Sequence, residues 1–322
     1  MGGGCDGSGS AGPASVRNGG DSTYSDTCNG SRLQLYVNLP PEPEPEWSEL
    51  YEETAEYIDG EGKSAWIPAG FRVSLKQGMN TIDEGLVIKA PEGSEFVWIP
   101  VANISDIYDS TNNAGQLWSF TSSTSSKRAF PGWNSSGFRE PDILTDTTNG
   151  DTNTNLSANG ISLTQSQFET QLKKEFGGMC ASVEEYKGFY IGRYETSVSG
   201  VGNPQSKKEQ EAMTKMNWWQ MYQKQRFSCN SVVVGMIWGS QFDQALRFVQ
   251  GGGYNVADST TWGNHSNSTG LAATGSGAKR TTGYSEAWKA CNIYDLAGNV
   301  WEWTIESGNA ISRVLRGRQL RI

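Results

Sequence analysis

Histidine is nearly absent from this sequence, which has one, His265, among 322 residues. That scarcity excludes a metal site built from several histidines. A Ser-His-Asp triad would have to use His265, and no nucleophile-elbow sequence accompanies it. His265 lies in the polar stretch 263–270, where we expect a solvated loop residue.

Paired cysteines are also missing. The five cysteines are widely spaced and form no C-x-x-C motif, so a zinc site lacks its usual paired ligands. They are Cys5, Cys28, Cys180, Cys229 and Cys291. Disulfides stay open as an alternative, but an odd number cannot all pair within the chain.

No hydrophobic run approaches 18 residues, so the sequence predicts no transmembrane helix. The first residues lack the basic and apolar regions of a signal peptide. Secretion is neither indicated nor excluded, and display at a surface or outside the cell stays compatible with the sequence. The net charge of −9 argues against nucleic acid as a partner, because phosphate backbones attract basic surfaces.

Glycine and tryptophan are plentiful. The chain has 39 glycines and 12 tryptophans, while apolar residues make up only 36%. Large indole rings can compensate for few aliphatic side chains, because each buries much apolar area. The composition predicts an irregular, loop-rich fold, and the order of helical and strand-like segments predicts the α+β class.

Three regions follow one another along the chain. Residues 1–46 are rich in Gly and Ser and then in Pro and Glu, which predicts a disordered leader. Residues 47–93 read as a small β-rich lead-in with short strands, which a short helix capped by Ser48 opens. Residues 94–322 form the main domain, and a polar segment at about 104–168 reads as a surface insertion.

Two helices are predicted in the main domain. Asn217 is placed to cap the first, with 218–227 as its body. Ser240 opens a capping-box pattern for the second, and Gly residues at 251–253 end it. The second helix has apolar residues at helical spacing on one face, namely Phe242, Ala245, Leu246 and Val249.

The segment N-I-Y-D-L-A-G-N-V-W-E-W-T (292–304) is the most informative stretch. A polar turn precedes a strand-like run with two tryptophans, which usually lie in a core. Asp295 and Glu302 supply two carboxylates, and the turn can direct backbone carbonyls toward the same point. Calcium prefers such all-oxygen ligands. The alternative is a tight turn before a core strand, with no ion.

This segment resembles the signature of the formylglycine-generating-enzyme-like (sulfatase-modifying-factor) family. Other segments resemble family motifs in the expected order, over about residues 94–317. They are F-V-W-I-P (96–100), F-Y-I-G-R-Y-E-T-S (189–197), N-W-W (217–219), W-G-N (262–264) and R-V-L-R-G (313–317). The resemblance implies a variant of the C-type lectin fold.

The resemblance also implies a structural calcium ion. Its ligands would be the Asp295 and Glu302 side chains and the Gly298 and Val300 carbonyls. Family members often have Asn where this chain has Asp295, and Asp is the stronger ligand by charge. Gly298 permits a backbone turn that bulkier residues cannot adopt.

Enzymatic members of the family oxidise a sulfatase cysteine with a pair of cysteines that binds copper. That pair follows an Arg-Gly-Gly segment. Here Arg318 replaces the second glycine, and no cysteine follows Cys291. The resemblance therefore predicts a domain truncated at its C-terminus, without copper, in which Cys180, Cys229 and Cys291 are buried or idle thiols.

The sequence thus predicts a non-catalytic ligand-binding or display module, whose ligand would be an unknown protein or glycan. Some family members are targets of diversity-generating retroelements. The alternative is a formylglycine-generating oxidoreductase whose catalytic cysteine tail is missing from this chain. A structural domain of a larger surface protein is a third reading. Ligand identity and oligomeric state stay open.

Overall fold

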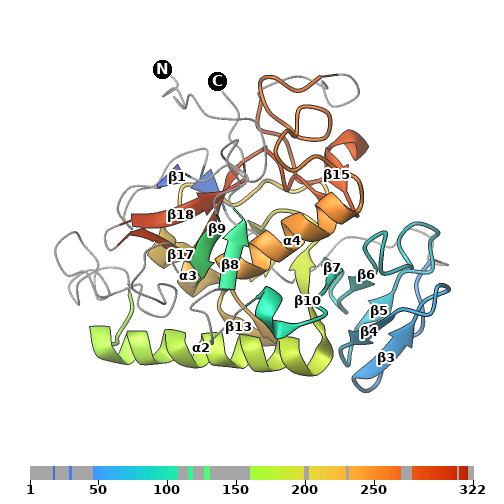
Figure 1. Cartoon of the computed structure of the whole chain (residues 1–322), viewed down its shortest axis with the longest axis horizontal. Helices are drawn as coiled ribbons and strands as arrows, with labels where there is room; N and C mark the ends of the chain where they lie inside the picture. The colour runs from blue at the N-terminus through green and yellow to red at the C-terminus, as the bar shows by residue number, and fades with distance from the viewer. Residues whose placement is uncertain are drawn as a thin grey trace.

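The computed structural model describes residues 46–107, 160–198, 203–229, 232–269, 278–309 and 312–317, together with four short strands outside these ranges. Most of the predicted leader and of the polar insertion otherwise lies outside the described residues, but residues 104–107 and 160–168 of the insertion are described. Helices and strands both contribute to the fold, which confirms the mixed α+β class (Figure 1).

A four-stranded antiparallel sheet of order β10-β7-β6-β5 lies near the centre. Its strands are β5 (Arg72–Val73), β6 (Val87–Lys89), β7 (Glu95–Pro100) and β10 (Gly188–Gly192). In register, Tyr190 pairs with Trp98 and Val87 with Val97. The segment 47–93 therefore shares a sheet with the following domain.

A second sheet joins the two ends of the described chain, in the order β1-β18-β17-β2. Its strands are β1 (Arg17–Asn18), β2 (Asn29–Gly30), β17 (Trp301–Asn309) and β18 (Ser312–Arg316). Strands β17 and β18 form an antiparallel hairpin, β1 pairs with β18, and β2 pairs parallel to β17.

The remaining strands form five two-stranded ribbons. These are β3 (Ala55–Ile58) with β4 (Ser64–Ile67), β8 (Gly115–Trp118) with β9 (Lys127–Phe130), β11 (Ser197–Val198) with β12 (Pro204–Gln205), β13 (Phe227–Cys229) with β14 (Val232–Val234), and β15 (Lys289–Ala290) with β16 (Ile293–Tyr294). The described residues also include two short 3-10 helices, η1 (Ile104–Asp106) and η3 (Glu286–Trp288).

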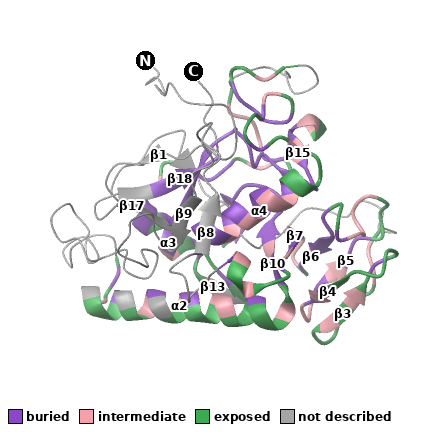
Figure 2. Cartoon of the chain, viewed as in Figure 1, coloured by how far each residue is buried: buried purple, intermediate pink, exposed green. Residues whose placement is uncertain are grey.

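The longest helix, α2 (Gln165–Tyr186), was not predicted from the sequence. Thr164 caps it in a capping box with Gln167, whose backbone N–H donates to Thr164 Oγ1 at 3.2 Å. Phe168 and Leu172 are fully buried, one turn apart on the inner face. Figure 2 shows that the opposite face of α2, along the lower edge of the molecule, is exposed.

Helix α3 (Trp218–Gln225) confirms the predicted start at its N-cap, Asn217, whose side chain accepts from Gln220 N. It is shorter than expected because β13 begins at Phe227.

Helix α4 (Gly239–Gly251) begins two residues before the expected position. Its N-cap is Trp238, whose backbone N–H donates to the Gln241 side chain, and Ser240 lies inside the helix. The predicted apolar face is confirmed, because Phe242, Ala245, Leu246 and Val249 are all buried.

The expected helix at 47–51 was wrong. Trp47 instead forms an isolated bridge with Ser74. Ser48 exchanges backbone and side-chain hydrogen bonds with Val73, both at 2.9 Å. Ser48 therefore bonds to the edge strand β5 at Val73, and its side chain is not available to cap a helix.

The two tryptophans of the signature segment lie in the core. Trp303 is 0% exposed and Trp301 7%. The Trp303 indole N–H donates to Met216 O, and the Trp218 indole N–H donates to Thr304 O at 2.9 Å. These bonds anchor β17 against the start of α3.

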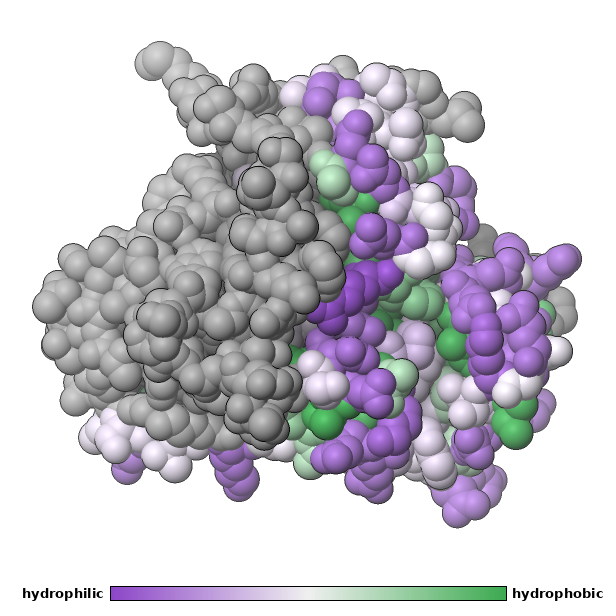
Figure 3. Space-filling model, viewed as in Figure 1, coloured by the Kyte–Doolittle hydropathy of each residue, from purple (hydrophilic) through white to green (hydrophobic). Residues whose placement is uncertain are grey.

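The described part of the face in Figure 3 is mostly hydrophilic, with small hydrophobic areas scattered over it. Among the helices that the structure describes, none combines the length and the apolar character needed to cross a membrane.

Candidate functional site

The predicted ligand residues lie in the buried turn between β16 and β17 and, for Glu302, at the start of β17. Asp295, Val300 and Glu302 are each 1% exposed. The backbone of this turn is left-handed at several positions, with φ of 56° at Asp295, 104° at Gly298 and 56° at Asn299. Positive φ costs free energy at non-glycine residues, so tertiary contacts must hold the turn.

Gly298 is required by close packing as well as by its φ. A Cβ at this position would lie 2.1 Å from Asn264 O. Gly298 and Asn264 form a parallel bridge, and Asn264 N donates to Ala297 O at 2.8 Å. The expectation that only glycine fits here agrees with this geometry.

The Asp295 side chain joins the turn to the segment before η3. Asp295 Oδ2 accepts from Gly283 N at 2.7 Å, and Asp295 N donates to Trp288 O at 3.0 Å. The carboxylate therefore accepts from one backbone N–H, and the backbone of the same residue holds the turn to η3.

Glu302 lies on β17 directly opposite Arg316 on β18. Directly opposite residues of an antiparallel pair point to the same face. Arg316 Nη1 forms an ion pair of 3.0 Å with Asp243 of α4, and both side chains are 1% exposed. A guanidinium thus shares the surroundings of the Glu302 carboxylate.

The Val300 carbonyl oxygen lies near Gly317, just after the C-terminal end of β18. A Cβ at Gly317 would lie 3.5 Å from Val300 O and 3.7 Å from Leu296 O. The structure therefore brings the Val300 carbonyl to the C-terminal end of β18, one residue beyond the partner of Glu302. Gly298 lies against Asn264, on another side of the turn.

Sequence reasoning missed three buried polar residues that hold this turn, namely Glu195, Asn264 and Asn299. Glu195 is 0% exposed and accepts from Asn299 Nδ2 at 2.5 Å and from Val300 N at 3.1 Å. Both Glu195 and Asn264 belong to segments that resemble the family motifs. Their position in those segments was the available signal.

The buried charges of the described residues are mostly negative. Five carboxylates and two guanidiniums are buried: Asp59, Glu195, Asp243, Asp295 and Glu302 against Arg193 and Arg316. Burying a carboxylate is costly unless hydrogen bonds or an opposite charge offset the lost hydration. A hard cation held by oxygen ligands fits this surplus of buried negative charge.

No group of three or more His, Cys, Asp or Glu side chains placed to hold a metal occurs among the described residues. The predicted calcium site has two carboxylates and two carbonyls, so this observation does not bear on it.

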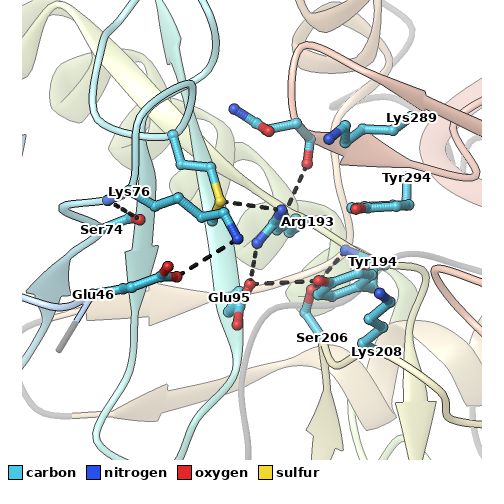
Figure 4. A network of polar contacts seen from close by, with 12 residues as sticks. Glu46, Ser74, Lys76, Glu95, Arg193, Tyr194, Ser206, Lys208, Lys289 and Tyr294 are labelled. Atoms are coloured by element: carbon cyan, nitrogen blue, oxygen red, sulfur yellow. Dashed lines mark hydrogen bonds and ion pairs between the residues drawn. The ribbon is translucent and has the colours of Figure 1, made fainter. Parts of the chain in front are cut away.

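A second polar network centres on Arg193, just beyond the end of β10 (Figure 4). Arg193 Nη1 lies 2.5 Å from Glu95 Oε2, and Arg193 Nε donates to Asn292 O at 3.2 Å. Its guanidinium lies over the rings of Tyr194 and Tyr294, which stack with centroids 5.0 Å apart. This network ties β7, β10 and β16 together.

Neither tyrosine of this network is a reactive group at neutral pH. The pKa of both phenols is raised, and burial is the largest cause. For Tyr294, the hydrogen bond to Glu286 at 2.5 Å raises the pKa further. We therefore assign the Arg193 network a structural role.

Two cysteines have described side chains, Cys180 and Cys291, and Cys291 is a free thiol. Cys291 is buried, and burial raises its pKa to about 11, so it stays protonated near neutral pH. A thiol is a poor nucleophile and metal ligand in that form. Cys180 is half-buried. The side chain of Cys229 lies outside the described residues.

His265 is not a solvated loop residue, because it is 0% exposed. Its Nε2 lies 3.0 Å from Ser259 Oγ, and its Nδ1 lies 2.7 Å from Asn267 Oδ1. Hydrogen bonds on both ring nitrogens offset the cost of burial, and the polar composition of the loop concealed this. Ser259 is also 0% exposed, so this arrangement offers a substrate no access.

Comparison of the chain with protein-family models, with curated proteins and with solved structures gives no match.

Proposed function

We propose that this chain is a non-catalytic ligand-binding or display module, built on a formylglycine-generating-enzyme-like, C-type-lectin-like scaffold that calcium stabilises. The observation that carries the proposal is the buried turn of residues 295–302. Two carboxylates, Asp295 and Glu302, are 1% exposed there, beside a glycine that admits no side chain.

The surplus of buried negative charge supports a cation at this turn. The Asp295 and Glu302 carboxylates and the Gly298 and Val300 carbonyls would hold it. Bound calcium would supply positive charge, not reactivity. An ion that binds only the folded state, at a hundredfold excess over its dissociation constant, adds about 2.7 kcal/mol to the free energy of unfolding.

The ligand surface would consist of the loops that this turn organises. Asn264 lies in the loop 255–269 and Gly283 in the segment 278–285, and both bond directly to the turn. Binding surfaces are commonly made of loops on a rigid base. An unknown protein or glycan is the proposed ligand, and display in the manner of retroelement-diversified proteins is the proposed setting.

Chelation tests the calcium part of the proposal. We expect a chelator to lower the melting temperature of the natural chain. Asp295→Asn and Glu302→Gln should each abolish most of that shift, whereas Glu56→Gln, at an exposed position of β3, should preserve it. Equal melting with and without chelator would contradict calcium binding.

Copper binding separates this proposal from the oxidoreductase alternative. Copper(I) prefers soft thiolate and thioether ligands, and burial keeps the Cys291 thiol protonated near neutral pH. We expect no tight stoichiometric binding when copper(I) is titrated into the purified chain. One copper bound tightly per chain would favour the formylglycine-generating alternative.

A further inference from the structure

Glu195 reaches the 297–300 turn from a distant part of the sequence. Its Oε1 accepts from Val300 N at 3.1 Å, and its Oε2 accepts from Asn299 Nδ2 at 2.5 Å. Glu195 is 0% exposed, so both bonds form away from water. Hydrogen bonds to a buried carboxylate are stronger than those between neutral groups.

Asn299 extends this contact to two other segments. Its Oδ1 accepts from Arg280 N at 2.8 Å and from Asn264 Nδ2 at 3.2 Å. Its backbone N–H donates to Asn264 O at 2.9 Å. The turn is thus held from three sides. Glu195 and Asn264 contribute side-chain atoms, whereas Arg280 contributes backbone groups.

We infer that Glu195 is a positioning residue that fixes the peptide planes of the turn, and thereby directs the Val300 and Gly298 carbonyls that would ligate calcium. The inference rests on the proposed function for its calcium part. The bond from Val300 N–H to Glu195 sets the orientation of the 299–300 peptide, which lies between the two peptides that carry the Gly298 and Val300 carbonyls. The first of these, the 298–299 peptide, is also held by the bond from Asn299 N–H to Asn264 O. Left-handed backbone at these positions needs such external support.

The chemistry of the two bonds requires a carboxylate. Val300 N and Asn299 Nδ2 are both donors, so the residue at 195 must accept with both oxygens. An amide offers one acceptor and one donor group. Glu195→Gln keeps the size of the side chain but sets two donors against each other.

A polarity swap provides the matched control. In Glu195→Gln/Asn299→Asp, the new amide donates to the new carboxylate, and its oxygen still accepts from Val300 N. The carboxylate at 299 also keeps acceptors for Arg280 N and for the Asn264 side chain. One bond is lost, from Asn299 Nδ2 to Arg280 O at 3.1 Å, and a carboxylate oxygen then faces that carbonyl, so the double variant should recover most but not all of the lost protection.

The first readout is hydrogen exchange at the Val300 amide in the metal-free protein. We expect exchange about tenfold faster in Glu195→Gln, as for the loss of one hydrogen bond, with the Ile305 amide unchanged. The double variant should restore slow exchange. Unchanged Val300 exchange in Glu195→Gln would overturn the positioning role, whether or not the protein binds calcium.

The second readout is the calcium dissociation constant, measured by calorimetry. We expect this constant to be at least about tenfold higher in Glu195→Gln and to return close to its original value in the double variant. An unchanged constant in Glu195→Gln would overturn the inference. Absence of calcium binding by the natural chain would contradict the proposed function, while Val300 exchange still decides the positioning role.

If Glu195→Gln yields no folded protein, the folding of the double variant tests the positioning role of Glu195. Recovery of folded protein in the double variant would then support the inference, because only the polarity of the contact is restored. An unfolded double variant would overturn it.

Discussion

Arg316 and Asp243 form an ion pair of 3.0 Å in which both side chains are 1% exposed. The pair joins β18 to α4, and Glu302 lies opposite Arg316 across the hairpin. Removing one partner of a buried pair is expensive because it leaves an uncompensated charge, at about 3–5 kcal/mol.

The position of Glu302 predicts an asymmetry within this pair. Arg316→Met should lower the free energy of unfolding more than Asp243→Asn, because it leaves two carboxylates, Asp243 and Glu302, without the guanidinium. Urea unfolding of both variants measures the difference. If Asp243→Asn lowers the free energy of unfolding more than Arg316→Met does, Arg316 does not stabilise the Glu302 carboxylate.

Gly298 predicts a second effect on stability. Gly298→Ala combines a φ of 104° with a Cβ 2.1 Å from Asn264 O, so we expect a loss of at least about 3 kcal/mol. Gly253→Ala is the matched control, because φ is 90° there but nothing lies within 4 Å of the added Cβ. It should cost about 1 kcal/mol. Equal losses in chemical denaturation would mean that the turn can move away from Asn264.

His265 should matter for stability although it is the sole histidine of a polar loop. His265→Ala leaves the buried hydroxyl of Ser259 without the imidazole, at about 1–3 kcal/mol, and also removes the contact with the exposed Asn267. Ser259→Ala removes one of the two contacts and should cost less. Thermal melting compares the two variants, and an unchanged melting temperature in His265→Ala would refute the structural role.

Glu286 predicts a contribution to acid sensitivity. Burial raises its pKa, but hydrogen bonds from Lys289 and Tyr294 and the charges of Lys289 and Lys208 outweigh this and lower the pKa to about 2. A lowered pKa in the folded state stabilises the protein above the ordinary pKa of 4.5. That stabilisation is lost as pH falls from 4.5 toward 2.

The measurement is stability against pH. We expect Glu286→Gln to flatten the acid limb between pH 4.5 and about 2, with little change in the shape of the curve above it. The Glu286 side chain is 62% exposed, so the effect should be small. An identical acid limb in the variant would refute the lowered pKa.

The sequence predicted those elements that are determined by residues within or next to them. The Asn217 cap lies beside the helix it starts, and the apolar face from Phe242 to Val249 lies within one helix. Helix α2 has comparable signals, in Thr164 with Gln167 and in apolar residues at every fourth position. Glycines 177 and 178 in its middle, which disfavour a helix, obscured them.

The turn shows where local reasoning ends. The burial of Asp295 and Glu302 agrees with their assignment as candidate ligands. The partners of this turn lie far away in the sequence, because Glu195 and Asn299 are 104 residues apart. No periodicity or spacing encodes such a contact, and only the folded chain brings the two together.

The sheet of β1, β18, β17 and β2 bears on the order of folding. Asn29 pairs with Trp301, and Arg17 with Leu315, so these ladders join residues that lie far apart in the sequence. Contacts of such sequence separation form slowly, because the chain must close a very large loop first. During translation, β1 and β2 leave the ribosome long before β17 and β18, so they cannot pair until the β17–β18 hairpin has also emerged.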